Sequence, residues 1–392
     1  MFQTLGHTYV MKRWTFQTIF TCESDNIKHM LAFAFEDFAL PRLRLNAIST
    51  LLGSGIFSLN GEPWTHARAV LKPGFVNKNK DAITDMLEAH FQALLRRLPT
   101  NGSEVDLQPL FFCLAMDFAT QYLTGNSSRM LDNPIANGKE MQFFEDYTTC
   151  SEEVVKRMRL GPLQIFRFNF AARAAKKRVF QYIDDFIDES LNIEQSEASE
   201  FVPEYNILRE LAAATDDRNV LRDQVLHILV AARDTTASLL GNIFFVLAKE
   251  KGIYDKLRAE VLSVAGKEAP THQHLKKMEY LKWCIQESLR LHPVIPTNAR
   301  EATRDTTLPY GGGQDGKSPL FLKRGALVIY NVFAMHRDKE VFGENAEEFV
   351  PERWGSLRPG WGYLPFNGGP RICLGPGLVG GALSGGADGA DI

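Results

Sequence analysis

The chain has 392 residues, of which 45% are hydrophobic and 23% charged, a globular balance that allows a sizeable buried core. The formal net charge of −3 gives no indication of a nucleic-acid partner. The cysteines have no paired spacing, which argues against a disulfide framework and a Cys-x-x-Cys zinc site and favours a reducing compartment. They are Cys22, Cys113, Cys150, Cys284 and Cys373.

The amino-terminal end predicts neither a signal peptide nor a membrane anchor. It begins Met-Phe-Gln-Thr-Leu, without a basic region followed by an apolar one. Partly alternating, β-branched and aromatic residues then predict strands between His7 and Cys22. Helical patterns dominate from Ser24 to Leu110, broken by a glycine-rich loop near Gly53–Gly55.

The middle of the chain is expected to be almost wholly helical from Leu110 to Ala248. An acidic, polar stretch at Asn192–Tyr205 is predicted to be a loop. The most apolar stretch, His227–Ala248, contains Arg233 and Asp234, so it predicts a buried helix and not a membrane span.

The last third predicts helices over Lys249–His292, closed by Pro293, and then a change of pattern. Short strands are expected between Ala299 and Tyr330 around the turn-forming run Gly311–Gly316. Because the helices are separated from the strands, we expect a mainly α fold with small β-sheets, without parallel β-α-β winding.

Residues Phe366–Gly375 read F-N-G-G-P-R-I-C-L-G. A cysteine thiolate that binds heme iron must stay ionised, so it needs backbone N–H donors and few bulky neighbours. Glycines 368, 369 and 375 let the backbone approach closely, and Pro370 stiffens the loop. Phe366 can shield the sulfur from water, and Arg371 can pair with a heme propionate. The alternative for Cys373 is a buried, inert cysteine beside a turn.

This run matches the signature F-x-x-G-x-R-x-C-x-G at Phe366, Gly369, Arg371, Cys373 and Gly375. On these residues the chain resembles the cytochrome P450 family of heme-thiolate monooxygenases. The resemblance implies the fold of that family, heme b (iron protoporphyrin IX) as cofactor and Cys373 as the iron ligand. It further implies insertion of one oxygen atom from O2 into a C–H bond, with NADPH acting through an NADPH-cytochrome reductase.

Glu287 and Arg290 lie three residues apart on one predicted helix, close enough to pair. Taken alone, this spacing is better explained by a surface ion pair. The run Pro351-Glu352-Arg353-Trp354 follows, and the two segments resemble the family's ExxR motif and its later PERF-like segment. The resemblance implies that Glu287, Arg290 and Arg353 form a buried charge network that braces the heme loop.

The predicted helix Leu226–Ala248 carries A-A-R-D-T-T at Ala231–Thr236. This resembles the family's oxygen-activation motif, [AG]-G-x-[DE]-T-[TS], which implies that Asp234 and Thr235 relay protons during catalysis. The structural alternative for threonine is a hydrogen bond to a carbonyl one turn earlier. Ala232 stands where the motif usually has glycine, and its methyl group can narrow the oxygen groove.

Pro63 favours a helix start, and Trp64 and Arg68 follow four residues apart on one face. The family has such a W-x-x-x-R pair on an early helix that contacts a heme propionate, which implies the same role here. The alternative places Trp64 in the core and Arg68 in solvent.

Four segments are similar to fungal alkane and fatty-acid hydroxylases within the family: residues 60–68, 232–240, 304–313 and 331–337. The similarity implies a small apolar substrate, hydroxylated at or near the end of a long aliphatic chain. Apolar residues at Ile56, Phe57, Val294 and Ile295 are compatible with a pocket for it.

A basic run predicts either a solvated helix face or a surface for reductase docking: Arg173, Lys176, Lys177 and Arg178. The family resemblance implies the endoplasmic reticulum membrane. The lack of a predicted anchor or signal leaves the cytoplasm as the alternative location.

Residues 1–375 are expected to form a partial P450 catalytic domain without the family's membrane helix and proline-rich hinge. Residues 376–392 contain six glycines, each of which costs about 1 kcal/mol in a helix relative to alanine. The family's helix after the cysteine is therefore not expected, and this glycine-rich tail is interpreted as a shifted reading frame or unspliced join. Two hypotheses follow: an active monooxygenase, or a truncated, non-catalytic product that binds heme poorly or not at all.

Overall fold

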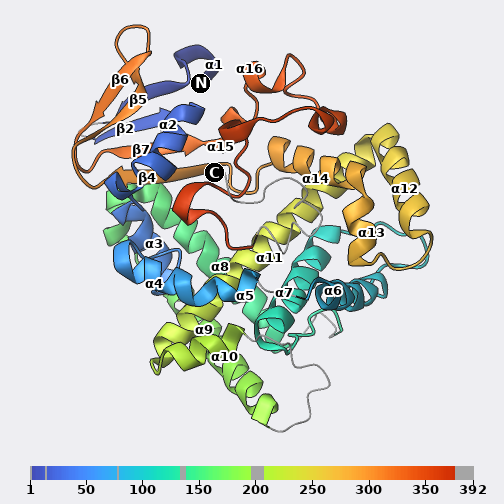
Figure 1. Cartoon of the computed structure of the whole chain (residues 1–392). Helices are drawn as coiled ribbons and strands as arrows, with labels where there is room; N and C mark the ends of the chain where they lie inside the picture. Colours follow the sequence, from blue (N-terminus) through green and yellow to red (C-terminus); the bar gives the residue numbers. More distant parts are fainter. Residues whose placement is uncertain (1, 14–15, 77–78, 133–137, 196–206, 376–392) are drawn as a thin grey trace. The chain divides into compact units, whose positions relative to one another are not determined.

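The computed structural model describes residues 2–13, 16–76, 79–132, 138–195 and 207–375 (Figure 1). Helices make up most of it, and the strands form two small sheets, so the mainly α fold class is confirmed. The chain divides into two compact units. The sheet unit consists of Met1–Pro41 and Asn242–Ile392, and the helical unit consists of Arg42–Gly241. The predicted glycine-rich tail, 376–392, lies outside the described residues.

The larger sheet of the sheet unit has the strand order β1-β2-β7-β4-β3. Its neighbours pair antiparallel except β2 and β7, which run parallel with Ile19 opposite Val328. Both of these side chains are buried, and a slip of one residue would turn them to the other face, so burial fixes the register. The strands are β1 (Thr8–Arg13), β2 (Phe16–Thr21), β3 (Phe38–Ala39), β4 (Thr297–Ala302) and β7 (Leu327–Asn331).

The second sheet is a hairpin of β5 (Thr306–Gly312) and β6 (Ser318–Leu322). Its turn contains Gly313 and Gly316, both in the left-handed region with φ of 73° and 70°. The strands predicted for both regions of the chain are thus confirmed. The two-residue β3 was not predicted because it is too short to show an alternating pattern.

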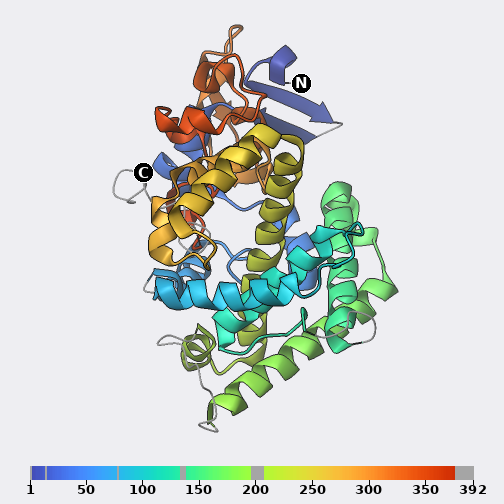
Figure 2. The same cartoon turned by 90° about the vertical axis from the view of Figure 1, so that its right-hand side faces the viewer.

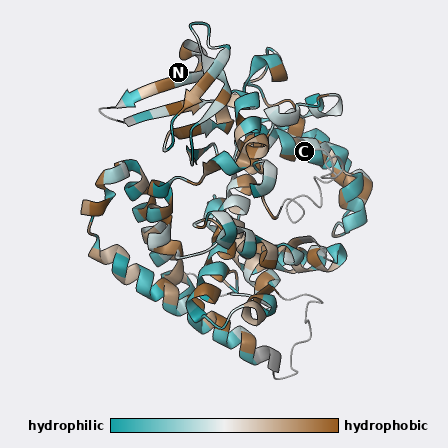
Figure 3. Ribbon diagram, turned by 60° about the vertical axis from the view of Figure 1, so that its left-hand side comes forward, coloured by the Kyte–Doolittle hydropathy of each residue, from teal (hydrophilic) through white to brown (hydrophobic). Residues whose placement is uncertain are grey.

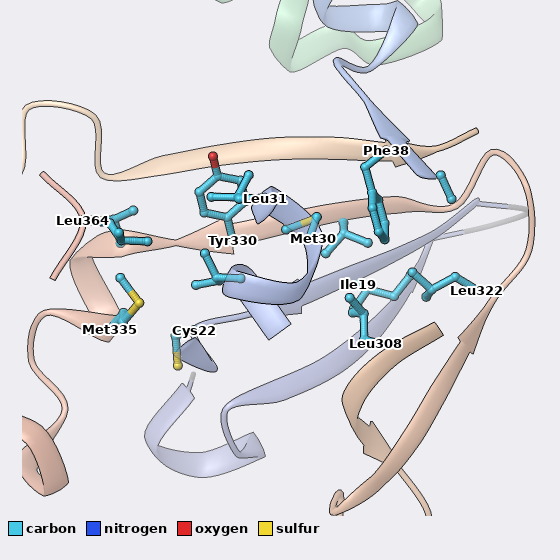
Figure 4. Packing of buried hydrophobic residues seen from close by; sticks show 14 residues of the cluster. Ile19, Cys22, Met30, Leu31, Phe38, Leu308, Leu322, Tyr330, Met335 and Leu364 are labelled. Carbon is cyan, nitrogen blue, oxygen red and sulfur yellow. The ribbon is translucent and has the colours of Figure 1, made fainter. Parts of the chain in front are cut away.

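The core of the sheet unit packs around the larger sheet (Figure 4). Leu31, from the π-helix His29–Phe33, lies beside Tyr330 of β7, and Leu364 contributes from the carboxyl-terminal part. All three are buried. Because Leu364 lies only two residues before Phe366, this core supports the start of the cysteine loop.

The sheet unit also contains the helices α12 (Lys251–Ala265), α13 (His272–Lys277) and α14 (Glu279–Leu291). α14 ends two residues before Pro293, as predicted, because proline disfavours a helical conformation at the residue before it. The remaining helices here are short: α1 (Phe2–Leu5), α2 (Ser24–Lys28), α15 (Val332–Met335), α16 (Lys339–Phe342) and the 3₁₀ helices Phe35–Asp37, Pro351–Gly355, Gly360–Gly362 and Gly369–Arg371.

Helices build the helical unit, in which α8 and α9 lie side by side (Figure 2). α11 starts in this unit and continues into the sheet unit. The elements are α3 (Arg42–Leu52), α4 (Gly61–Leu71), α5 (Pro73–Val76), α6 (Lys80–Leu95), α7 (Leu107–Thr124), α8 (Lys139–Leu160), the 3₁₀ helix Gly161–Phe166, α9 (Phe170–Gln195), α10 (Ile207–Ala214) and α11 (Arg218–Lys249).

The described part of Leu110–Ala248 is mainly helical, as predicted, with loops between the helices. α7 ends at Thr124, before Gly125 with φ of 79°, and Asp117 accepts backbone N–H bonds from Met130 and Leu131 in the loop that follows. One prediction for the helical unit needs correction. The loop predicted at Asn192–Tyr205 begins too early, because α9 continues to Gln195. Glutamate and glutamine are good helix formers, which explains the extension. The rest of that loop, 196–205, lies outside the described residues.

Hydrophobic and hydrophilic residues alternate along the described helices (Figure 3). Within the described ranges, no helix combines the length and apolar character that crossing a membrane requires. The most apolar stretch belongs to α11, as predicted.

Candidate functional site

Two backbone N–H groups form hydrogen bonds within the turn around Cys373. The N–H of Cys373 donates to the carbonyl of Phe366 at 3.0 Å, and the N–H of Gly375 donates to the Cys373 Sγ at 3.3 Å. A hydrogen bond to the charged form of a group favours that form, so this contact favours the thiolate. Cys373 is exposed, which leaves its sulfur accessible to a ligand.

The other four cysteines are buried. Burial raises the pKa of the Cys22 and Cys284 thiols to about 12 and that of the Cys113 and Cys150 thiols to about 11. These thiols stay protonated at neutral pH, and a thiolate is the form that binds metal. Cys373 differs from these four in being exposed, so the alternative of a buried cysteine is wrong for it, while its ligation of heme iron stays a prediction.

Glycine is required at two positions of the loop. Gly369 has φ of 67°, and a Cβ there would lie 1.9 Å from the carbonyl oxygen of Leu31. A Cβ on Gly368 would lie 2.7 Å from the ring of Trp361. The prediction that these glycines permit a close backbone approach is confirmed. Asn367 also has a left-handed backbone, with φ of 66°, and accepts a hydrogen bond from the Tyr330 hydroxyl at 2.9 Å.

Glu287 is the centre of a buried polar network. Its carboxylate accepts two hydrogen bonds from Arg290, both at 2.8 Å, and neither side chain is exposed. Arg353 donates to the same carboxylate at 2.9 Å, and so does the Trp354 indole N–H, at 3.0 Å. The structure therefore brings the three predicted residues together, and the alternative of a surface ion pair is wrong.

This network fixes the segment between α15 and the 3₁₀ helix Pro351–Gly355. Arg290 donates to the carbonyls of His336, Ala346 and Glu348 at 2.8, 2.6 and 2.9 Å. Since these acceptors are backbone atoms, the network sets the path of the chain whatever side chains the segment carries.

His336 connects the network to the approach of the cysteine loop. Its Nδ1 donates to the Arg290 carbonyl at 3.2 Å, and its Nε2 accepts the N–H of Leu364 at 2.9 Å. Burial lowers the pKa of His336 to about 3, so the ring is neutral and one nitrogen remains an acceptor.

The α11 motif presents a different arrangement. The Thr235 hydroxyl donates to the Ala231 carbonyl at 2.6 Å, which is the bond expected of the structural alternative. The Asp234 carboxylate accepts from the Tyr147 hydroxyl at 2.8 Å and from Arg233 at 2.7 Å. Proton relay by Asp234 and Thr235 stays a prediction.

Trp64 and Arg68 lie on α4, as the spacing predicts. Trp64 is 6% exposed, and the Arg68 guanidinium carbon lies 5.9 Å from its ring centroid. Arg68 is half-buried, so it is not a fully solvated arginine. Their contact with a heme propionate stays a prediction, as do the roles of Phe366 and Arg371, both half-buried.

Comparison with known proteins identifies the family. The family model for cytochrome P450 matches residues 1–379. The chain belongs to the cytochrome P450 family.

Curated P450 relatives agree with this assignment. The chain is 41% identical to the cytochrome P450 monooxygenase himC of Aspergillus japonicus, covering 95% of this chain and 68% of the relative. It is 40% identical to the cytochrome P450 monooxygenase FPY7 of Fusarium mangiferae, over 95% of this chain and 73% of the relative. It is 41% identical to cytochrome P450 52A3-A of Candida maltosa, over 94% of this chain and 73% of the relative. These matches favour the monooxygenase hypothesis over the non-catalytic alternative.

Membership of the P450 family implies heme. In the sheet unit, a second side chain besides that of Cys373 suits this cofactor. Arg300 on β4 is 2% exposed, and its guanidinium donates to the Ala299 carbonyl at 2.9 Å. Among the described residues, Arg300 forms an ion pair with no carboxylate. A buried cation without an anionic partner is costly, so an anionic group such as a propionate suits this position.

Sequence reasoning missed Arg300, His336 and Tyr147. Arg300 and His336 belong to segments noted only for similarity or strand pattern, and nothing in their spacing marks them as buried. The signal that could have found them is an isolated arginine or histidine inside an apolar strand or a short helix.

Proposed function

We propose that this P450 binds heme through the Cys373 thiolate and hydroxylates an aliphatic C–H bond of a long-chain alkane or fatty acid. The observation that carries the proposal is the Gly375 N–H directed at the sulfur of the one exposed cysteine. Bound heme would supply oxygen activation, which a thiolate ligand promotes. Cys373 would hold the cofactor, and Arg300 and Arg371 would pair with its propionates. Asp234 would take up and release protons.

The test of ligation is the spectrum of the reduced, carbon-monoxide-bound full chain. The parent should show a thiolate-type spectrum, and Cys373→Ala should lose it while much of the helical content remains. Cys113→Ala is the matched control, because it removes a buried thiol of raised pKa and should leave the spectrum unchanged. A thiolate-type spectrum retained by Cys373→Ala would identify another residue as the ligand.

The substrate class rests on the four segments that are similar to fungal alkane and fatty-acid hydroxylases. Apolar side chains such as Ile56 and Phe57 are compatible with it, and Phe57 stacks on His227 with ring centroids 5.4 Å apart. Dodecane or dodecanoic acid should shift the heme absorption spectrum at low concentration and yield terminal or near-terminal alcohols. A bulky aromatic compound that binds better than both would contradict this substrate class.

We further infer that NADPH-cytochrome reductase supplies the electrons. In the basic run on α9, Arg178 is exposed but already pairs with Asp146 at 2.7 Å, and Lys176 is half-buried, 4.8 Å from the Phe180 ring. Arg173 and Lys177 are exposed and are the two positions left for docking. A charge-reversed pair at these positions should slow reduction by the reductase but not by dithionite.

Attachment to the endoplasmic reticulum membrane is the location we propose. Its support is an exposed stretch of apolar residues from Leu163 to Phe170, the first residue of α9, which we call the apolar segment. Arg167 within it is anchored to Glu153 at 2.7 Å, while the apolar side chains on either side remain in solvent. Exposed apolar patches of this kind mark membrane or protein contacts. The segment consists of Leu163, Ile165, Phe166, Phe168 and Phe170, which are 61%, 70%, 72%, 70% and 79% exposed.

Flotation with phosphatidylcholine–phosphatidylethanolamine vesicles tests this location. The full chain should float with the vesicles, and Phe166→Ser/Phe168→Ser should remain at the bottom of the gradient. Phe33→Ser/Phe321→Ser is the matched control, because these rings are 74% and 58% exposed but lie in the sheet unit. Equal flotation of the two double variants would contradict the role of the apolar segment.

A further inference from the structure

The Asp234 carboxylate is held at both oxygens. Its Oδ2 accepts the Tyr147 hydroxyl of α8 at 2.8 Å, and its Oδ1 accepts the Arg233 guanidinium at 2.7 Å. The Asp234 side chain is 42% exposed, so packing alone does not restrain it. These two hydrogen bonds therefore decide the direction in which the carboxylate points.

Arg233 cannot easily leave this position. Its side chain is 6% exposed, and its guanidinium carbon lies 4.5, 4.4 and 4.9 Å from the ring centroids of Phe112, Phe144 and Tyr147. Guanidinium stays charged in proteins, and aromatic faces attract it. Within the part of the chain that the structure describes, Asp234 is the only acidic residue that forms an ion pair with Arg233. The three aromatic rings thus keep the Arg233 guanidinium in place, and the guanidinium in turn fixes the Asp234 carboxylate.

The Tyr147 contact is the one that can be exchanged. A phenol hydroxyl rotates about its C–O bond without any change in charge, whereas releasing Arg233 would leave a buried cation unpaired. Thr235 cannot take the place of Tyr147 as donor without giving up its 2.6 Å bond to Ala231. A proton that binds to Oδ2 competes with a donor that can turn away, whereas one that binds to Oδ1 would weaken the pairing of a buried cation. Oδ2 is therefore the oxygen better suited to take up a proton.

We propose that Tyr147 and Arg233 are positioning residues for Asp234, and that the Tyr147 hydroxyl is the contact released when Asp234 exchanges a proton. This inference rests on the proposed function, in which Asp234 handles protons. It adds two residues to that function and assigns each a role. Arg233 fixes Oδ1 of Asp234, and Tyr147 controls when Oδ2 can exchange a proton.

A double-mutant cycle on the full chain tests the clamp without any need for activity. Tyr147→Phe keeps the ring of the cage and removes only the hydroxyl, and Asp234→Ala removes the acceptor. In urea unfolding, the two changes should be coupled by a factor of roughly three to ten in the unfolding constant. Tyr122→Phe is the matched control, because its hydroxyl donates to the Gly74 carbonyl at 2.8 Å and should show no coupling with Asp234→Ala. Should Asp234→Ala fail to fold, Asp234→Leu replaces it, since it removes the acceptor and leaves a side chain that fills the space.

The second readout is the amount of peroxide released per NADPH consumed by the reconstituted protein. Tyr147→Phe should change this ratio, and it should change nothing further in the Asp234→Ala background. Coupling below twofold in unfolding, or independent effects on peroxide release, would overturn the clamp. A parent protein without a thiolate-type spectrum would instead contradict the proposed function, and the unfolding cycle would still decide the clamp.

Discussion

Glu287 and Arg290 are joined by two 2.8 Å hydrogen bonds, although neither side chain has any exposed surface. A buried ion pair is often no more stabilising than a well-packed apolar pair. This one differs in what it organises, since Arg290 reaches three backbone carbonyls and Glu287 accepts from Arg353 and Trp354. Loss of either partner leaves the rest of the network without its counter-charge.

Glu287→Gln should lower the free energy of unfolding by about 3–5 kcal/mol, because it leaves two arginines without a buried counter-charge. Urea unfolding followed by circular dichroism measures this. Glu344→Gln is the control, because its ion pair with Lys339 is exposed at 2.8 Å and its loss should leave the urea midpoint unchanged. Equal midpoints for the two variants would contradict the role of the network.

Gly369→Ala should prevent the cysteine loop from closing, because the new Cβ would collide with the Leu31 carbonyl. Gly360→Ala separates strain from collision: Gly360 also has a positive φ, 53°, but nothing lies within 4 Å of its Cβ position. We expect Gly360→Ala to cost about 1–2 kcal/mol of stability and to keep the thiolate-type spectrum. Gly369→Ala should cost more and lose that spectrum, and an intact spectrum would show that the backbone can shift.

Acid should destabilise the chain through two buried histidines. Burial lowers the pKa of His336 to about 3 and that of His227 to about 4, both below the value of 6.5 for an unfolded chain. The unfolded state therefore binds more protons in between, and stability falls as the pH drops below 6.5. Each histidine should contribute a loss of about 2 kcal/mol between pH 6.5 and 5.

Urea midpoints measured from pH 7.5 to 5 check this prediction. His227→Gln should flatten the dependence, since the neutral side chain can still accept the Phe57 N–H that Nδ1 accepts at 3.1 Å. The exposed His66 supplies the control variant His66→Gln, which should keep the parent slope. An unchanged slope in His227→Gln would mean that the ring is accessible to protons.

Arg300→Met should have opposite effects on the two forms of the protein. Without heme, removal of a buried cation that lacks a carboxylate partner should raise stability by about 1–3 kcal/mol. With heme, loss of the cation should lower heme retention through gel filtration. The exposed Arg324 gives the control Arg324→Gln, expected to change neither. Reduced stability with unchanged heme retention would contradict the assignment.

The sequence predicts the cysteine loop, the pairing of Glu287 with Arg290 and most elements, because each depends on local spacing or on a glycine requirement. It does not predict His336 or Arg300, whose environments are built by chain segments far away. The Leu364 N–H reaches His336 across 28 residues, and the Arg300 guanidinium lies 5.7 Å from the ring centroid of Tyr330 on another strand. The end of α9 was misplaced for a local reason, since an acidic stretch with glutamine suits a helix terminus as well as a loop.

The parallel pairing of β2 with β7 has a consequence for how the chain is made. Residues 18–21 pair with 327–330, and the whole helical unit lies between them in the chain. During synthesis, residues 42–241 leave the ribosome and can fold before β7, the partner strand of β2, has been made. Such distant pairing carries a loop-closure cost and slows folding. A chain stalled before residue 327 would leave the first hairpin with an unpaired edge, open to pairing with another nascent chain.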